Sequence, residues 1–152
     1  MAQSTSKINI FTFFKLPAAW WCGVRMKSMD HQRAVVTVKY RWINQNPFKS
    51  MYWAVQGMAA ELSTGAMVTD QIRASGEKIS MLVANNTANF SKKARGRITF
   101  TCTDGHLIKD ALQRTIETGE GQTLWMKSEG MDENNNLVST FAFEWTLKLK
   151  QQ

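Results

Sequence analysis

A few polar side chains surround the start of a long apolar segment, and one carboxylate lies within it. Asn44, Asn46 and Ser50 stand at the beginning, and Glu61 follows inside the segment. The first N–H groups of a helix lack intrahelical partners and carry about half a positive charge, so a helix start can stabilise an oxyanion. Burial would raise the pKa of Glu61 towards the range of a general base. These residues predict a site that polarises a carbonyl group.

The segment from Ser50 to about Met67 is predicted to be the helix that positions these groups. Turn residues precede it, and Pro47 is placed to open it. Large and small apolar residues follow one another on every side, so the helix should be buried nearly all round. Its 18 residues would span roughly 27 Å at about 1.5 Å per residue, enough to cross a small sheet.

Six other segments carry the alternation of apolar and polar residues that predicts strands. They are Gly23–Asp30, Ala34–Ile43, Ile79–Phe90, Arg97–Thr103, Gln122–Met131 and Leu137–Leu149. The last two are predicted to form a hairpin across residues 132–136. One apolar helix among about six antiparallel strands predicts an α+β domain in which the sheet curls around the helix.

Two further helical regions are expected. Residues 8–22 should form one or two short helical turns broken near Pro17. Asp104 should cap an amphipathic helix that ends at Gly119. Residues 1–6 are polar and predicted to be a disordered tail. At 152 residues with 43% hydrophobic content, the chain (1–152) is predicted to be a single domain.

The net charge of +7 favours an anionic partner. Lys92, Lys93 and Arg95 belong to the densest basic run, which is either a solvated loop or a cradle for phosphate groups. The run is short, has only Phe90 as an aromatic neighbour and belongs to no nucleic-acid-binding module, so we expect no nucleic-acid partner.

Several classes of protein are disfavoured. Cys22 and Cys102 are 80 positions apart (102 − 22 = 80), and neither His31 nor His106 has a partner at metal-ligand spacing. We therefore expect no disulfide, no metal site and no cofactor. The most apolar stretch, residues 8–23, is interrupted by a lysine and a proline and resembles neither a membrane helix nor a signal peptide. We expect a cytoplasmic protein without a membrane partner.

The stretch NQNPFKSMYWAVQGMAAELSTG, residues 44–65, resembles the central-helix motif of PaaI-like acyl-coenzyme A thioesterases of the hot-dog superfamily. It is closer still to a domain-of-unknown-function branch whose helix begins Asn-Pro-Phe-x-Ser-Met-Tyr. In the PaaI-like pattern an acid follows the opening Asn by 15 positions, as Glu61 follows Asn46 (61 − 46 = 15). The resemblance extends over about residues 15–150, including the closing strand FAFEWTLKLK.

This resemblance implies a hot-dog fold and hydrolysis of acyl-coenzyme A or a related thioester, with coenzyme A as part of the substrate. Asn46 would polarise the thioester carbonyl, and Glu61 would activate water or act as a nucleophile that forms an anhydride. The protein would be a homodimer or a dimer of dimers, in which Glu61 serves the site opened by the partner subunit's Asn46. The alternatives from the residues alone remain open: Asn46 as a helix cap, and Glu61 as a carboxylate that reaches solvent or an arginine.

The sequence departs from the PaaI-like pattern at four positions. Lys49 stands where the first glycine falls, Tyr52 where the histidine falls, and Trp53 and Ala54 where two further glycines fall. Fewer glycines limit close approach of the backbone to a substrate. Tyr52 can donate a hydrogen bond but is no base near neutrality. These departures favour the rival function, a non-catalytic hot-dog domain that binds acyl-coenzyme A or a fatty acid.

The remaining candidates are residues expected to contact the substrate. Met51 and Trp53 lie at helical spacing, which is also typical of a helix core. Ser50 is also typical of a residue that starts a helix. The predicted substrate-binding set is Asn44, Ser50, Met51, Tyr52, Trp53, Lys92, Lys93 and Arg95.

Overall fold

The structure, a computed structural model, describes residues 4–151. Helices and strands follow one another in mixed order along the chain. The helices are α1 (Thr5–Lys15), α2 (Pro17–Trp21), α3 (Trp53–Ser75) and α4 (Gly105–Thr118), with a short 3-10 turn, η1 (Trp42–Asn44), before α3. The strands are β1 (Arg25–Met29), β2 (Ala34–Lys39), β3 (Ile79–Phe90), β4 (Arg97–Cys102), β5 (Gln122–Met131) and β6 (Leu137–Leu149).

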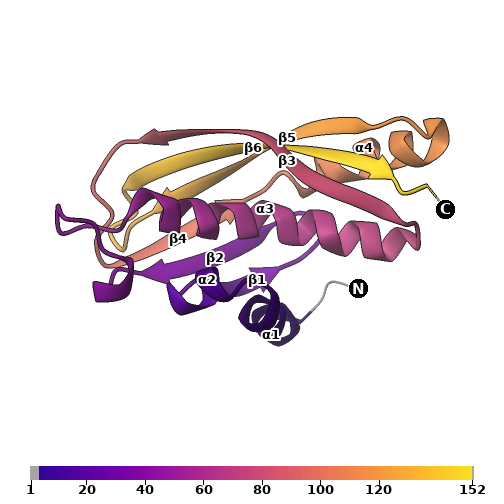
Figure 1. Cartoon of the computed structure of the whole chain (residues 1–152). Helices are drawn as coiled ribbons and strands as arrows, with labels where there is room; N and C mark the ends of the chain where they lie inside the picture. Colours follow the sequence, from indigo (N-terminus) through magenta and orange to yellow (C-terminus); the bar gives the residue numbers. More distant parts are fainter. Residues whose placement is uncertain (1–3, 152) are drawn as a thin grey trace.

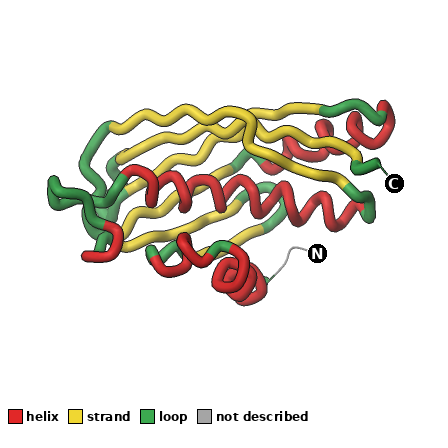
Figure 2. Tube along the Cα trace, in the orientation of Figure 1, coloured by secondary structure: helices red, strands yellow, loops and turns green. Residues whose placement is uncertain are grey.

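The six strands form one antiparallel sheet in the order β1-β2-β4-β5-β6-β3. The sheet curves around α3, which runs lengthwise along its concave side (Figures 1 and 2). β1 and β3 are therefore the two edge strands, and α1 packs beside β1. This arrangement confirms the predicted α+β architecture.

The core lies between α3 and the inner face of the sheet. Ala59 and Ala60 of α3 are fully buried and let the helix approach the strands closely. Opposite them the sheet contributes large apolar side chains, each of which stabilises the fold by about 1.5–3 kcal/mol when buried. Buried residues of the sheet include Val36, Val38, Ile98, Phe100, Met126, Phe141 and Leu147.

Two polar contacts cross this core. Ser63 of α3 lies 2.7 Å, Oγ to Oγ, from Ser128 of β5, and the indole Nε1 of Trp145 donates to Thr64 Oγ1 at 3.0 Å. Because unpaired polar groups are costly in a low-dielectric interior, these bonds fix the rotation of α3 relative to the sheet. The side chain of Glu61 is thereby given a defined direction.

The helix α3 differs from its prediction at both ends. It begins at Trp53 rather than Ser50, because residues 47–50 form a turn with Lys49 in the left-handed region, and Met51 N–H bonds Ala94 O at 2.8 Å. It continues to Ser75 rather than stopping near Met67. Gly76, with φ of +76°, supplies the left-handed residue that ends it.

Other boundaries were predicted with mixed success. The bounds of β3, β5 and β6 are confirmed, and α1 and α2 break at Pro17 as expected. β2 ends at Lys39 instead of residue 43, because η1 turns the chain away from the sheet. Asp104 precedes α4 as predicted but does not cap it, since its carboxylate accepts Lys127 N–H instead.

The N-terminal tail is shorter than expected. Ser4 caps α1 by accepting Lys7 N–H, and residues 5 and 6 already belong to the helix. The prediction of a disordered tail is therefore wrong for residues 4–6, because a serine N-cap and the apolar residues that follow it start a helix there. Residues 1–3 lie outside the described part of the chain.

Candidate functional site

The loop before α3 is built around Asn44. This side chain is buried, accepts Arg41 N–H at 2.8 Å, and donates to the carbonyl oxygens of Cys22 and Lys39 at 2.9 Å each. Both amide donors thus serve the backbone. Asn44 holds the loop in place, and its predicted contact with substrate stays a prediction without support from this geometry.

Asn46 and Ser50 brace the second half of the same loop. Asn46 Nδ2 donates to Ser50 Oγ at 3.0 Å, and Asn46 Oδ1 accepts Phe48 N–H at 2.9 Å. The backbone N–H of Asn46 also bonds Ser50 O at 2.8 Å. Asn46 therefore shapes the approach to α3 from seven positions before the helix begins (53 − 46 = 7), rather than capping it.

Lys49 adopts a backbone conformation that favours glycine. Its φ is +59°, in the left-handed region that costs a residue with a β-carbon about 1–2 kcal/mol. Arg95 Nε donates to Lys49 O at 3.1 Å and helps to hold this shape. A lysine thus adopts a conformation for which glycine is better suited, at the position where the PaaI-like pattern has a glycine.

The start of α3 presents free amide groups. Tyr52 is the N-cap residue, but its side chain does not cap the helix. Among the described residues nothing accepts the N–H groups of Trp53 and Ala54, the first two residues of α3. These donors carry the positive end of the helix dipole and are available to a developing oxyanion.

A surface groove of about 480 Å³ lies over this helix start. Most of the predicted contact residues line this groove. Phe90 of β3 also forms part of its wall. Tyr52 and Trp53 are about half exposed there, whereas Met51 is buried and belongs also to the core. The predicted residues that line the groove are Asn46, Ser50, Met51, Tyr52, Trp53, Lys92 and Lys93.

The basic run forms one rim of this groove. Lys92 Nζ pairs with Asp132 Oδ2 at 2.7 Å, and this contact is the first cause that lowers the pKa of Asp132 to about 2. Lys93 lies beside it, and Arg95 contacts the loop through Lys49 O. The rim is therefore cationic, with one lysine already neutralised by a carboxylate.

Glu61 lies two turns further along α3, about 12 Å from Trp53 at about 1.5 Å per residue. It is partly buried, and burial raises the pKa of its carboxyl group. No hydrogen bond or charge within residues 4–151 opposes that shift. Glu61 thus has the raised pKa that the sequence predicted.

Two hollows meet at Glu61. A cavity of about 220 Å³ continues along α3 towards Arg73 and has mostly apolar walls, including Leu62, Ala66 and Met81. A shallower groove of about 340 Å³ leads from Glu61 back to Trp53, which also lines the groove at the helix start. A row of hollows therefore follows one side of α3, and the Glu61 carboxylate lies between the cavity that continues towards Arg73 and the grooves that lead to the helix start.

Gly65 leaves room beside this carboxylate. A β-carbon at this position would lie 2.9 Å from Trp145 Cζ2 and 3.2 Å from Glu61 Oε1. Any larger residue would push the indole or the carboxylate aside.

Comparison with known proteins places the chain in a family. The family model described as "Domain of unknown function (DUF4442)" matches residues 5–147. The chain belongs to the DUF4442 family. No functionally curated protein matches this DUF4442 sequence.

Solved structures resemble this DUF4442 protein over nearly its whole length. PA5026 from Pseudomonas aeruginosa, described as a protein of unknown function and probable thioesterase, is 20% identical, with a TM-score of 0.85 and 99% of each chain covered. The thioesterase HI1161 from Haemophilus influenzae is 13% identical, with a TM-score of 0.78 and coverage of 100% of this chain and 95% of that chain. The predicted hot-dog fold is confirmed.

Sequence reasoning missed the residues at the far end of the DUF4442 cavity. Ile8 and Phe11 of α1 form part of its wall, and Asp70 and Arg73 lie on the unpredicted last turns of α3. The continued apolar spacing through Met67, Val68 and Ile72, followed by Gly76, would have shown that α3 runs further.

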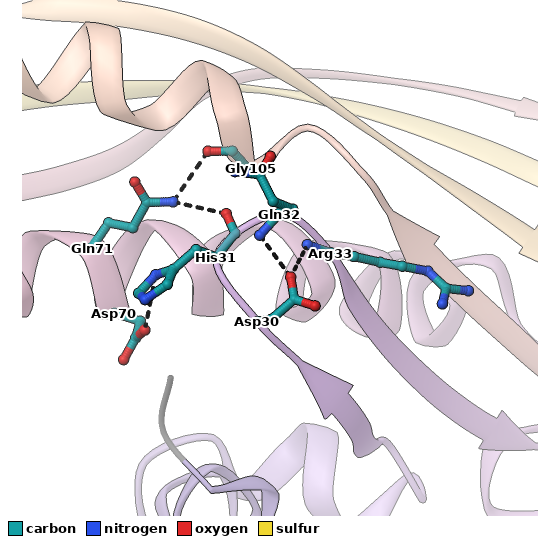
Figure 3. A network of polar contacts seen from close by, with 7 residues as sticks. All are labelled: Asp30, His31, Gln32, Arg33, Asp70, Gln71 and Gly105. Atoms are coloured by element: carbon teal, nitrogen blue, oxygen red, sulfur yellow. Dashed lines mark hydrogen bonds and ion pairs between the residues drawn. The ribbon is translucent and has the colours of Figure 1, made fainter. Parts of the chain in front are cut away.

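A polar network fixes this end of α3. Asp70 is buried and lies 3.9 Å from His31 Nδ1 in the β1–β2 turn (Figure 3). Gln71 Nε2 donates to His31 O and to Gly105 O, at 3.2 and 3.1 Å. The network joins the end of α3 to the β1–β2 turn and the start of α4, so these residues have a structural role.

Metal-ligand clusters, disulfides and membrane-spanning helices are absent from the described part of this DUF4442 domain. Within residues 4–151 no group of three His, Cys, Asp or Glu side chains could hold a metal ion. Cys22 and Cys102 are free thiols, and burial raises the pKa of Cys102 to about 12. No helix in the same range is long and apolar enough to cross a membrane.

Proposed function

We propose that this DUF4442 protein hydrolyses acyl thioesters, with acyl-coenzyme A as the leading substrate class. One observation carries the proposal: Glu61, whose pKa is raised by burial, lies between an apolar cavity and a groove that leads to free helix-start amides. The apolar cavity suits an acyl chain, and the raised pKa suits a general base.

The reaction would use two groups of this chain. The N–H groups of Trp53 and Ala54 donate to the thioester carbonyl oxygen, and Glu61 takes a proton from water. The water oxygen bonds to the carbonyl carbon, and negative charge develops on the carbonyl oxygen beside the helix start. Collapse of this intermediate breaks the C–S bond, and the proton held by Glu61 passes to the leaving sulfur. The products are a carboxylic acid and a thiol.

The distance along α3 favours a site shared by two copies. Glu61 and the helix start of one chain are about 12 Å apart, too far to act on one carbonyl. Among the described residues, 4–151, β3 is an edge strand with β6 as its one partner, and it is exposed from residue 84 to residue 90. Pairing of two β3 edges would join two sheets. We propose a homodimer, or a dimer of dimers, in which Glu61 faces the partner's helix start.

The cavity also suggests the length of the acyl group. Its volume of about 220 Å³ would hold roughly seven methylene groups, if each takes about the 30 Å³ that a water molecule takes in the liquid. We therefore expect medium-length acyl chains. Lys93 and Arg95 at the groove rim are the side chains that we assign to the phosphates of coenzyme A. Free Cys22 and Cys102 are consistent with a reducing compartment, and we propose a cytoplasmic location.

A non-catalytic acyl binder is the second candidate. The bulky side chains of Tyr52 and Trp53 stand at the helix start, where the PaaI-like pattern has a histidine and a glycine. They narrow the access of a thioester to the amide groups. The same cavity and basic rim would then hold an acyl-coenzyme A or a fatty acid without turnover.

A thiol-release assay with acyl-coenzyme A substrates from acetyl to palmitoyl distinguishes the two functions. We expect turnover to peak at medium chains and to fall by about 100-fold or more in Glu61→Gln and Glu61→Ala. The acid limb of the pH–rate profile should lie above the ordinary glutamate range, because the raised pKa of Glu61 must be exceeded to form the base.

The control variant is Glu120→Gln, which removes an exposed carboxylate in the turn after α4. It should keep full activity. Equal activity of the wild type and Glu61→Gln would contradict the role of Glu61. Binding of acyl-coenzyme A without any thiol release would favour the non-catalytic binder.

A further inference from the structure

The N-terminal helices present apolar side chains to solvent. Phe14 is 71% exposed, Trp21 63% and Ile10 58%. Ile10 and Phe14 lie on the side of α1 opposite its buried residues, Ile8 and Thr12, and this side has no partner in the described chain. Trp21 belongs to α2, which packs against α1. We call the exposed side chains of Ile10, Phe14 and Trp21 on these two helices the aromatic face.

Positive charge surrounds the aromatic face. The first 29 residues contain no aspartate or glutamate, and their cations are Lys7, Lys15, Arg25 and Lys27. Lys7 lies one turn before Ile10 and two turns before Phe14 on the same exposed side of α1. Lys15 ends that helix, seven residues after the buried Ile8 and therefore on the other side of it. The aromatic face thus combines apolar anchors with cations, the composition that binds anionic lipid surfaces.

The aromatic face is also held rigidly. Asn9 Nδ2 donates to Met26 O at 3.1 Å and Asn9 Oδ1 accepts Met26 N–H at 2.9 Å, which ties α1 to β1. Arg25 stacks on Trp20 at 3.3 Å from the ring centroid and donates to Trp20 O, which fixes α2 to the same strand. The face needs no ordering when it binds, so its apolar area is available for association.

A second copy of the chain fits this face less well than a lipid surface. α1 is bound to β1, the sheet edge opposite β3 in strand order, and β3 is the free edge proposed for pairing of copies. If two such faces met, their lysines would repel each other, because residues 1–29 contain no aspartate or glutamate that could pair with them.

We infer that the aromatic face docks on an anionic membrane surface, with Phe14, Trp21 and Ile10 entering the headgroup region, Lys7 contacting lipid phosphates and Lys15 adding attraction at longer range. The binding is peripheral and depends on charge. Phe11 of the same helix lines the apolar cavity below. Docking would therefore bring the cavity close to a source of acyl chains, but it does not depend on hydrolysis.

Cosedimentation of the full chain with vesicles tests this inference. We compare vesicles of phosphatidylcholine alone with vesicles containing about one third phosphatidylglycerol. The protein should bind the anionic vesicles at least about tenfold more tightly, and added salt should weaken the binding. Phe14→Ser with Trp21→Ser, and separately Lys7→Gln with Lys15→Gln, should each reduce it by about tenfold.

Trp125→Ser is the matched control, because Trp125 is an exposed tryptophan on β5. It should bind like the wild type, and circular dichroism should show that all variants remain folded. Absence of vesicle binding, or equal binding by the variants of the aromatic face, would overturn the inference. A lower mass in solution for Phe14→Ser with Trp21→Ser would also overturn it, because the face would then join copies of the chain.

Discussion

Lys49 departs from the glycine of the PaaI-like pattern and adopts a left-handed backbone conformation. Its φ of +59° is the conformation for which glycine is suited, and Asn46 and Arg95 hold the loop on either side. The sequence alone identified the departure but not its consequence, because backbone dihedral angles depend on the contacts of the whole loop. The lysine also adds a cation to the loop before α3.

Replacement of Lys49 by glycine should stabilise the protein. The strain of the left-handed conformation would be relieved, while the greater freedom of glycine in the unfolded chain offsets part of the gain. We expect the free energy of unfolding in urea to rise by about 0.5–1 kcal/mol. Lys49→Ala removes the same charge but keeps a β-carbon, so it should bring no gain. A glycine variant no more stable than the alanine variant would show that the strain is absent.

The roles of the other site residues could be predicted only in part. The spacing of Asn46 and Glu61 predicted two site residues that do line hollows: Asn46 lines the groove at the helix start, and Glu61 lines the groove further along α3. The sequence could not show that the side-chain amide of Asn44 donates to two backbone carbonyl oxygens. That contact depends on the positions of Cys22 O and Lys39 O in the folded chain. The raised pKa of Glu61 was predictable because its neighbours along the helix are apolar.

At the scale of elements, local patterns predicted most of the fold. β3, β5 and β6 have their predicted bounds, because alternation and turn residues mark both ends of each strand. α3 was misplaced where local rules compete. Pro47 resembles a helix start, but Asn46 holds the next residues in a turn, and Met51 N–H bonds Ala94 O outside the helix. Such long-range bonds are not visible in a local pattern.

The free edge of β3 gives a prediction for this element. Neighbouring residues of a strand direct their N–H groups to opposite sides. Of Thr87 and Ala88, one therefore directs its N–H group towards β6 and the other directs it towards the free edge. Proline removes an N–H group. We expect one of Thr87→Pro and Ala88→Pro to give a folded monomer, and the other to lower stability by about 3 kcal/mol. Light scattering and thermal unfolding distinguish them. Unchanged mass in both variants would exclude pairing through β3.

At the scale of the molecule, the groups proposed to act on the thioester, the helix-start amides and Glu61, lie apart within one chain. The helix-start amides and the basic rim lie at one end of the row of hollows, and Glu61 lies about 12 Å further along α3. The N-terminal helices cover the apolar cavity and leave the aromatic face outside. The sequence predicted a curled sheet and an enclosed helix, and the resemblance implied that Glu61 serves the site of the partner's Asn46. The start of α3 at Trp53 emerged only from the structure.

Complementation between two inactive variants tests the shared site most directly. Asn46→Ala disturbs the helix start of its own copy, and Glu61→Gln removes the base of its own copy. Each variant alone should be inactive. After unfolding and refolding of an equal mixture, half of the dimers are mixed and each regains one intact site, so thiol release should return to about one quarter of the wild-type rate. A mixture as inactive as its components would contradict a site formed by two copies.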